Sequence, residues 1–149
     1  MALIDLITEE AVKVPLISQT KPEIIKELIR LLHETGHIEQ FEAAYDAVLT
    51  REAQGSTGLE NGIAVPHAKT NAVKSLTIAI GISPAGVDFE ALDGNPSHLF
   101  FLMLAPPDQP GPHIEALAEI ARLTRSKAFC NMVTAAASAR EVVEIFREE

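Results

Sequence analysis

The chain has 149 residues, of which 12 are basic and 21 acidic, so its formal net charge is −9. This balance argues against nucleic-acid binding, which needs a basic surface, and the length predicts a single domain over residues 1–149. A single cysteine, Cys130, excludes an internal disulfide and fits a cytoplasmic location. The first ten residues lack the regions of a signal peptide, and the longest apolar run, 99–105, is too short to cross a bilayer.

Two helices are predicted in the first third of the chain. Thr20 and Glu23 form a capping-box pattern, and apolar residues then recur at three- and four-residue steps as far as Gly36, which favours a helix end. A second helix is predicted from near residue 40 to residue 53. A polar, glycine-bearing loop, 55–62 (GSTGLENG), follows it.

Three strand candidates come next. Residues 63–65 form a short apolar run that stops at Pro66, which has no N–H to continue a ladder. Residues 76–82 alternate large and small side chains, as a strand with one more deeply packed face would. Residues 99–105 are apolar throughout, which predicts a central strand covered by helices on both sides.

The last third of the chain is predicted to be mostly helical. Apolar residues mark an amphipathic helix around 114–121, and Ser138 and Glu141 form a second capping box that begins a helix running to the C-terminus. Helices separated by buried strands predict an α/β layered sandwich.

His67 lies directly after Pro66 in GIAVPHAK and is the first candidate functional residue. The proline fixes the backbone, the small Ala68 leaves the ring accessible, and functional residues concentrate on loops at strand ends. A neutral imidazole nitrogen is a good nucleophile near pH 7 and forms a phosphoramidate of high transfer potential. The pattern alone leaves two interpretations open, a nucleophile and a loop histidine with no role.

His113 lies at or near the start of the helix predicted around 114–121. Unpaired N–H groups at a helix start favour a nearby anion, and a second histidine can orient the first or hydrogen-bond a phosphate oxygen. The alternative is a first-turn residue whose side chain lies in water.

The sequence also holds a zinc-protease pattern, HETGH at residues 33–37. Gly36 falls inside it, where the apolar periodicity ends, so His37 is expected beyond the helix end. No metal site is predicted, because the two histidines would not share one helical face.

The loop 55–62 lacks the lysine of a nucleotide-binding P-loop, so nucleotide binding is not predicted. Ser56 and Thr57 can donate hydroxyls to an anion, although turn formation alone would explain them. Arg51 can pair with a phosphate, or it can be a solvated helix charge.

Four segments between Arg51 and Arg125 together resemble the type-2 (fructose/mannitol) EIIA family of the bacterial phosphoenolpyruvate:sugar phosphotransferase system. They are RE..GSTGLENGIAVPHAK, GVDFEALDG, HLFFLMLAPPD and HIEALAEIARLTR, in the family's order and spacing. The resemblance implies a mixed β-sheet flanked by helices. Within that family, the chain most resembles the stand-alone fructose-type components, because Ala68 stands where the nitrogen-regulatory branch typically has glycine.

The resemblance also implies roles for individual residues. His67 matches the phosphorylated histidine, His113 the second active-site histidine, and Arg51 an arginine that helps surround the phosphate. We expect the hydroxyls of Ser56 or Thr57 to assist, and no metal or cofactor to be needed. The implied donor is the phosphocarrier HPr and the implied acceptor is a cysteine of an EIIB domain. Any link to a membrane is indirect, through EIIC.

Three other functions remain as alternatives. A nitrogen-regulatory EIIA would accept phosphate on the same histidine and signal by phosphorylation-dependent protein binding. An interaction domain would no longer be phosphorylated, which the intact Pro-His motif disfavours. A zinc hydrolase built on HETGH is disfavoured by Gly36.

Overall fold

The computed structural model describes residues 3–149, and its centre is a five-stranded sheet. The strand order is β1-β4-β5-β2, and β3 pairs with β5 beside β2. β4 and β5 are antiparallel, whereas the other pairs are parallel, so the sheet is mixed. The strands are β1 (Val12–Lys13), β2 (Ile63–Ala64), β3 (His67–Lys69), β4 (Thr77–Val87) and β5 (Ser97–Ala105).

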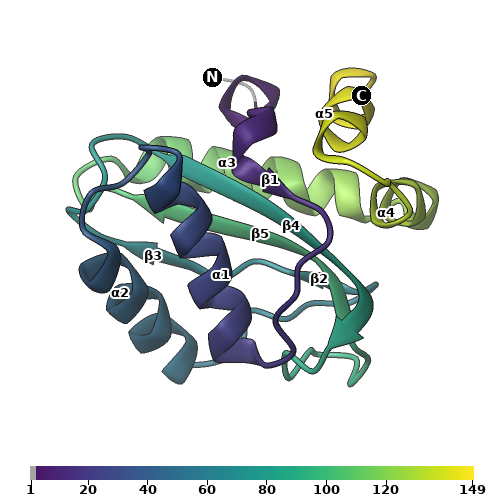
Figure 1. Cartoon of the computed structure of the whole chain (residues 1–149), viewed down its shortest axis with the longest axis horizontal. Coiled ribbons are helices and arrows are strands. Elements are labelled where there is room, and N and C mark those ends of the chain that lie inside the picture. Colours follow the sequence, from purple (N-terminus) through teal and green to yellow (C-terminus); the bar gives the residue numbers. More distant parts are fainter. Residues whose placement is uncertain (1–2) are drawn as a thin grey trace.

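Helices cover both faces of this sheet, so the α/β layered sandwich is confirmed (Figure 1). The first two α-helices pack on one face and the last three on the other. None of the helices in residues 3–149 is long and apolar enough to span a membrane. The helices are the 3₁₀ turns η1 (Leu3–Leu6) and η2 (Glu9–Ala11), then α1 (Lys21–Glu34), α2 (Phe41–Ala53), α3 (Pro110–Thr124), α4 (Lys127–Thr134) and α5 (Ala139–Arg147).

β5 is the central strand that its apolar sequence predicts. The odd-numbered side chains of 99–105 join the hydrophobic cluster beneath α3, α4 and α5. The even-numbered side chains of 100–104 join the cluster beneath α1 and α2. Because successive side chains of a strand point to opposite faces, an apolar run of this length is buried only where both faces are covered.

The segment around Pro66 differs from its prediction as a strand followed by a loop. β2 ends at Ala64, and Pro66 contributes only its carbonyl, which accepts the N–H of Met103 over 3.0 Å. Pairing with β5 resumes at once, with His67 opposite Met103. The expectation of a loop was therefore wrong: His67 lies on a short edge strand, whose pairing fixes its backbone.

The predicted helix starts form in two different ways. Ser138 caps α5, because its hydroxyl accepts the N–H of Glu141 over 3.2 Å. Thr20 precedes α1 as predicted, but its hydroxyl donates to the Glu23 carboxylate over 2.8 Å and does not accept a backbone N–H.

Candidate functional site

His67 begins β3, and a hydrogen bond fixes its half-buried ring. Its Nδ1 lies 2.8 Å from the carbonyl oxygen of Val65. Because a carbonyl oxygen only accepts hydrogen bonds, the neutral ring carries its proton on Nδ1. The lone pair is therefore on Nε2, which is the nitrogen available as a nucleophile.

His113 reaches the same place from the first turn of α3. The centroids of the two imidazole rings lie 5.2 Å apart, and the ring planes are inclined by 71°. His113 is only 5% exposed, and its Nε2 has no hydrogen-bond partner in the part of the chain that the structure describes. Burial lowers the pKa of His113, and the proximity of His67 and Lys69 lowers it further. A ligand oxygen would supply the partner that buried polar atoms normally have.

A cavity of about 640 Å³ opens where α2, β3 and the start of α3 meet. Arg51, in the last turn of α2, donates from Nη1 to the carbonyl oxygen of Gly55 over 2.9 Å. This bond uses one of five guanidinium N–H groups and holds the cation at the cavity. The lining residues are Ala43, Asp46, Ala47, Thr50, Arg51, Gln54, His67, Ala68, Lys69 and His113.

The structure thus brings together Arg51, His67 and His113, and it leaves Ser56 and Thr57 outside the cavity lining. The Ser56 hydroxyl donates to the carbonyl oxygen of Phe89 over 2.7 Å. The buried Thr57 hydroxyl donates to the carboxylate of Glu52. Both hydroxyls are engaged within the protein, so the expectation that they face an anion does not match this geometry.

The start of α3 is also a weaker anion site than expected. Pro110 and Pro112 occupy its first and third positions, and proline has no N–H to donate. The local contribution of α3 to the cavity is therefore the imidazole of His113 more than its backbone.

Four polar lining residues were not predicted: Asp46, Thr50, Gln54 and Lys69. Lys69 had a usable signal, because residues two apart on a strand share one face and His67 is two positions before it. Asp46 is the acidic side chain among the described lining residues. Nothing in the sequence distinguishes it from the other charges of α2.

The other histidines lie away from this cavity. Gly36, at φ +82°, follows the end of α1, so His37 lies beyond the helix as predicted and pairs with Glu10 over 2.9 Å. His33 contacts the edge of the Phe41 ring, and His98 bonds through Nδ1 to the carbonyl oxygen of Ser83. Within residues 3–149, no three His, Cys, Asp or Glu side chains gather as a metal ion would require.

The chemistry of the cavity depends on these positions. Nε2 of His67 can attack an electrophilic group, and the guanidinium of Arg51 and the ammonium of Lys69 favour an anionic one. The buried Nε2 of His113 can hydrogen-bond the same group without adding a charge. The arrangement suits transfer of an anionic group to a histidine.

Comparison with known proteins also points to a phosphotransferase protein. Residues 5–149 match the model of the family described as phosphoenolpyruvate-dependent sugar phosphotransferase system, EIIA 2. The fructose-specific EIIABC component of Bacillus subtilis is 35% identical over 148 residues, which are 99% of this chain and 23% of that protein.

Solved structures agree on the fold. Nitrogen regulatory protein IIA-Ntr from Neisseria meningitidis superposes with a TM-score of 0.87 at 28% identity, over 96% of this chain and 97% of that one. The mannitol enzyme IIA of Escherichia coli, solved in complex with phosphorylated enzyme IIB, has a TM-score of 0.80 at 22% identity, over 94% of this chain and 96% of that one. The family model covers nearly the whole chain, and the sheet and helices superpose on solved EIIA structures; the protein therefore belongs to the type-2 EIIA family of the phosphoenolpyruvate-dependent sugar phosphotransferase system.

Proposed function

We propose that the chain carries a phosphoryl group on Nε2 of His67, taking it from phospho-HPr and passing it to a cysteine of an EIIB domain. The observation that carries the proposal is the hydrogen bond from His67 Nδ1 to the Val65 carbonyl. It leaves the Nε2 lone pair free beside a buried nitrogen of His113 that has no hydrogen-bond partner among residues 3–149. The family to which the chain belongs supports the same role.

In the forward step, the Nε2 lone pair attacks phosphorus in line and forms the new N–P bond. The bond between phosphorus and the HPr histidine breaks, and its electron pair returns to the HPr imidazole. The proton on Nδ1 of His67 stays in place, held by Val65. Transfer to EIIB reverses the roles: the cysteine thiolate attacks phosphorus, and the electron pair of the N–P bond returns to Nε2.

Charge on the transferring group is balanced by side chains of the cavity. Arg51 and Lys69 supply positive charge, and His113 supplies a hydrogen bond from a neutral ring. Phosphoryl transfer is accelerated mostly by positioning and by electrostatic stabilisation. Because Ser56 and Thr57 donate elsewhere, their hydroxyls are assigned no contact with the phosphoryl oxygens.

The partner proposals rest on relatives. The Bacillus subtilis relative carries the name EIIABC, and a mannitol enzyme IIA has been solved in complex with phosphorylated enzyme IIB. From these relatives we infer that this chain also passes its phosphoryl group to an EIIB domain and serves sugar transport. HPr is the donor that the family's place in the phosphotransferase system implies.

The test is the intact mass of the protein after incubation with phosphoenolpyruvate, enzyme I and HPr. We expect wild type to gain one phosphoryl group and His67→Ala to gain none. His33→Ala, which removes an exposed histidine of α1, is the matched control and should gain the group. Labelling of His67→Ala would contradict the proposal, and so would an unlabelled wild type beside a labelled control EIIA.

A nitrogen-regulatory role is the second candidate, favoured by the similarity to IIA-Ntr of Neisseria meningitidis over nearly the whole chain. Both candidates use the same phosphorylated histidine and differ in the fate of the phosphoryl group. Transfer from the phosphorylated chain to an EIIB encoded beside it would support transport. Absence of that transfer, with phosphorylation-dependent binding of another protein, would support regulation.

A further inference from the structure

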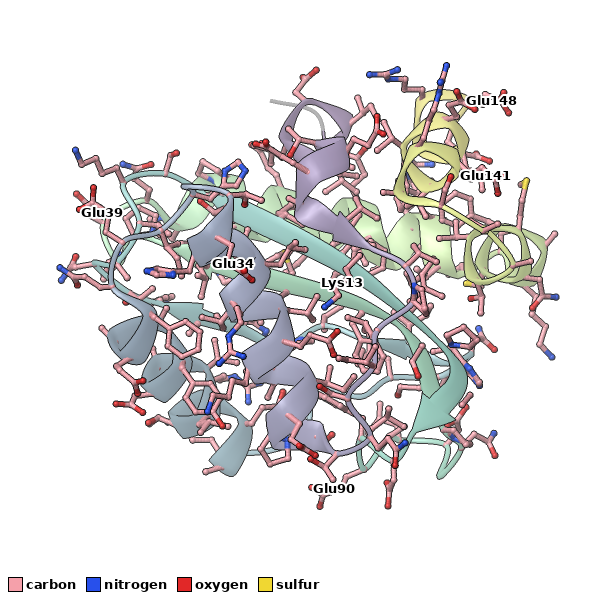
Figure 2. All side chains as sticks on the ribbon, viewed as in Figure 1. Lys13, Glu34, Glu39, Glu90, Glu141 and Glu148 are labelled. Atoms are coloured by element: carbon pink, nitrogen blue, oxygen red, sulfur yellow. The ribbon has the colours of Figure 1, made fainter. Side chains whose placement is uncertain are left out.

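An ion pair with a buried carboxylate lies at the far end of the loop that leads to His67. Nζ of Lys21, the first residue of α1, is 2.8 Å from Oε2 of Glu52, in the last turn of α2. The Glu52 side chain is only 5% exposed. Lys21 also pairs with Glu90, which Figure 2 labels below the start of α1, and lies over the ring of Phe89. Since a buried carboxylate is costly unless its oxygens are satisfied, the other partners of Glu52 are informative.

Glu52 holds Thr57 by two hydrogen bonds. One carboxylate oxygen accepts the Thr57 hydroxyl, and the other accepts the Thr57 N–H over 3.3 Å. Thr57 is itself 3% exposed. The carboxylate therefore fixes both the side chain and the backbone of one loop residue.

The loop transmits this position to the residue that binds His67. The carbonyl oxygen of Thr57 accepts the N–H of Val65 over 3.0 Å, and Gly58 pairs antiparallel with Ala64. The carbonyl of Val65 is the acceptor for Nδ1 of His67. A continuous set of hydrogen bonds thus runs from Glu52 through Thr57 and Val65 to the His67 ring.

The loop is also held on its opposite side, by contacts of Gly58 with the segment at Ala91 and Leu92. The carbonyl of Gly58 accepts the N–H of Leu92 over 3.1 Å. A Cβ added at Gly58 would lie 2.9 Å from Cα of Ala91, closer than real Cβ contacts. Residues 57–59 are therefore held between two backbone segments, so a displacement of Thr57 has to move one of them.

We infer that Glu52 is a positioning residue for His67: by holding Thr57 it fixes the Val65 carbonyl, which keeps the proton of His67 on Nδ1 and the lone pair on Nε2. Glu52 touches neither the ring nor the phosphoryl group, and it acts through the loop. The tautomer part stands on the structure alone, whereas the effect on transfer rate rests on the proposed function.

A second pair of a buried carboxylate with a lysine provides a matched control, although its lysine, Lys13, is more exposed than Lys21. Glu27 has an 8% exposed side chain, lies 2.8 Å from Nζ of Lys13, and accepts backbone N–H groups from Ile17 and Ser18. It resembles Glu52 in burial, in its lysine partner and in its bonds to a loop. Among residues 3–149, Ile17 and Ser18 share no hydrogen bond with residues 57–67, so Glu27→Gln should disturb stability without disturbing the ring.

The test compares Glu52→Gln, Thr57→Val, Thr57→Ser and Glu27→Gln with wild type in the full chain. Long-range ¹H–¹⁵N spectra of histidine-labelled protein report which ring nitrogen of His67 carries the proton. Phosphorylation by phospho-HPr is timed on the same samples, and thermal unfolding confirms that each variant is folded.

We expect His67 in wild type, Thr57→Ser and Glu27→Gln to carry its proton on Nδ1. Glu52→Gln and Thr57→Val should populate the Nε2–H form. Since a 1 Å misplacement can cost on the order of 10²-fold in rate, Glu52→Gln should slow transfer by roughly 10- to 100-fold, and Thr57→Val by less. The loss should appear in kcat, with KM for phospho-HPr unchanged, because Glu52 lies away from the cavity lining.

Several outcomes would overturn the inference. One is a folded Glu52→Gln that matches Glu27→Gln in tautomer and rate. Another is a slow Thr57→Val with an unchanged tautomer, which would show that its hydroxyl contacts the phosphoryl group directly. If Glu52→Gln does not fold, the tautomer and transfer rate of Thr57→Val test the inference instead. A wild type that accepts no phosphoryl group would refute the proposed function, while the tautomer comparison would still test the positioning.

Discussion

Two hollows of equal volume, about 640 Å³ each, lie on this protein, and they differ in how their charges are used. The groove along the outer side of α1 is lined by charges of both signs, among them Lys13 and Glu34, which Figure 2 labels beside α1. Its cations have partners: Lys13 pairs with Glu27, and Arg30 lies over the ring of Phe41. In the cavity at β3, by contrast, the buried Nε2 of His113 has no partner among residues 3–149.

The difference shows that volume does not identify a functional site, because both hollows would hold a ligand of the same size. Charged groups that already neutralise one another gain little from an added anion, and exposed pairs contribute little to stability. A nucleophile with a defined lone pair, beside a donor without a partner, gains from the right ligand. Substitutions in the cavity at β3 should therefore affect transfer more than matched substitutions in the α1 groove.

The largest contrast should come from the two arginines. Arg51→Gln should slow phosphorylation by phospho-HPr on the order of 10²-fold, as loss of one preorganised charge-stabilising donor does, whereas Arg30→Gln should leave the rate within about twofold. Single-turnover phosphorylation followed by intact mass measures both. Equal rates for the two variants would show that Arg51 does not stabilise the transferring phosphoryl group.

His113→Gln should have a smaller effect on transfer. The imidazole donor is replaced by an amide of different reach while the nucleophile remains, so we expect a rate on the order of tenfold lower, which corresponds to about 1.5 kcal/mol, the lower end of what a hydrogen bond to a charged group contributes. The final extent of labelling should still reach one phosphoryl group. A variant with no labelling at all would mean that His113 is itself the acceptor or is required to position His67.

The pH dependence of stability should report the burial of His113. Burial lowers the pKa of His113 below its usual 6.5, so the unfolded chain binds more protons in that range than the folded protein. The free energy of unfolding should therefore fall as pH decreases below about 6.5 and recover above it. Urea unfolding at several pH values measures this slope, which His113→Gln should reduce. An undiminished slope in His113→Gln would assign it to other groups.

The smallest effect should come from Glu34→Gln in the α1 groove. Glu34 is exposed at the last residue of α1, and surface substitutions usually change stability by less than about 0.5 kcal/mol. Both the unfolding free energy and the phosphorylation rate should match wild type. A slower rate would mean that the α1 groove also takes part in partner binding.

Most of the fold was predictable because its long elements have strong periodicity. α1, α2 and β5 lie where the apolar patterns place them. α4 was missed because it has only 8 residues, KAFCNMVT, too few turns for a helical pattern to emerge. β3 was missed because its three residues follow a proline, and only pairing with β5 makes them a strand.

The site was predictable as far as single residues carry chemical signals. His67, His113 and Arg51 were identified as candidates, and three separate elements bring them to one cavity. The positions of the Ser56 and Thr57 hydroxyls were not predictable, because they depend on Phe89 and Glu52, which the fold brings close to the loop. The pairing of Lys21 with Glu52 was not predictable either, because only the fold brings these two residues together.

The central claim is that phosphorus bonds to one particular atom, Nε2 of His67. The most direct measurement is a ³¹P–¹⁵N correlation spectrum of the phosphorylated, histidine-labelled protein, with His67→Ala used to assign the ring. We expect phosphorus coupled to Nε2 of His67, with the proton still on Nδ1 against the Val65 carbonyl. Phosphorus on Nδ1 of His67, or on a ring that persists in His67→Ala, would contradict this claim.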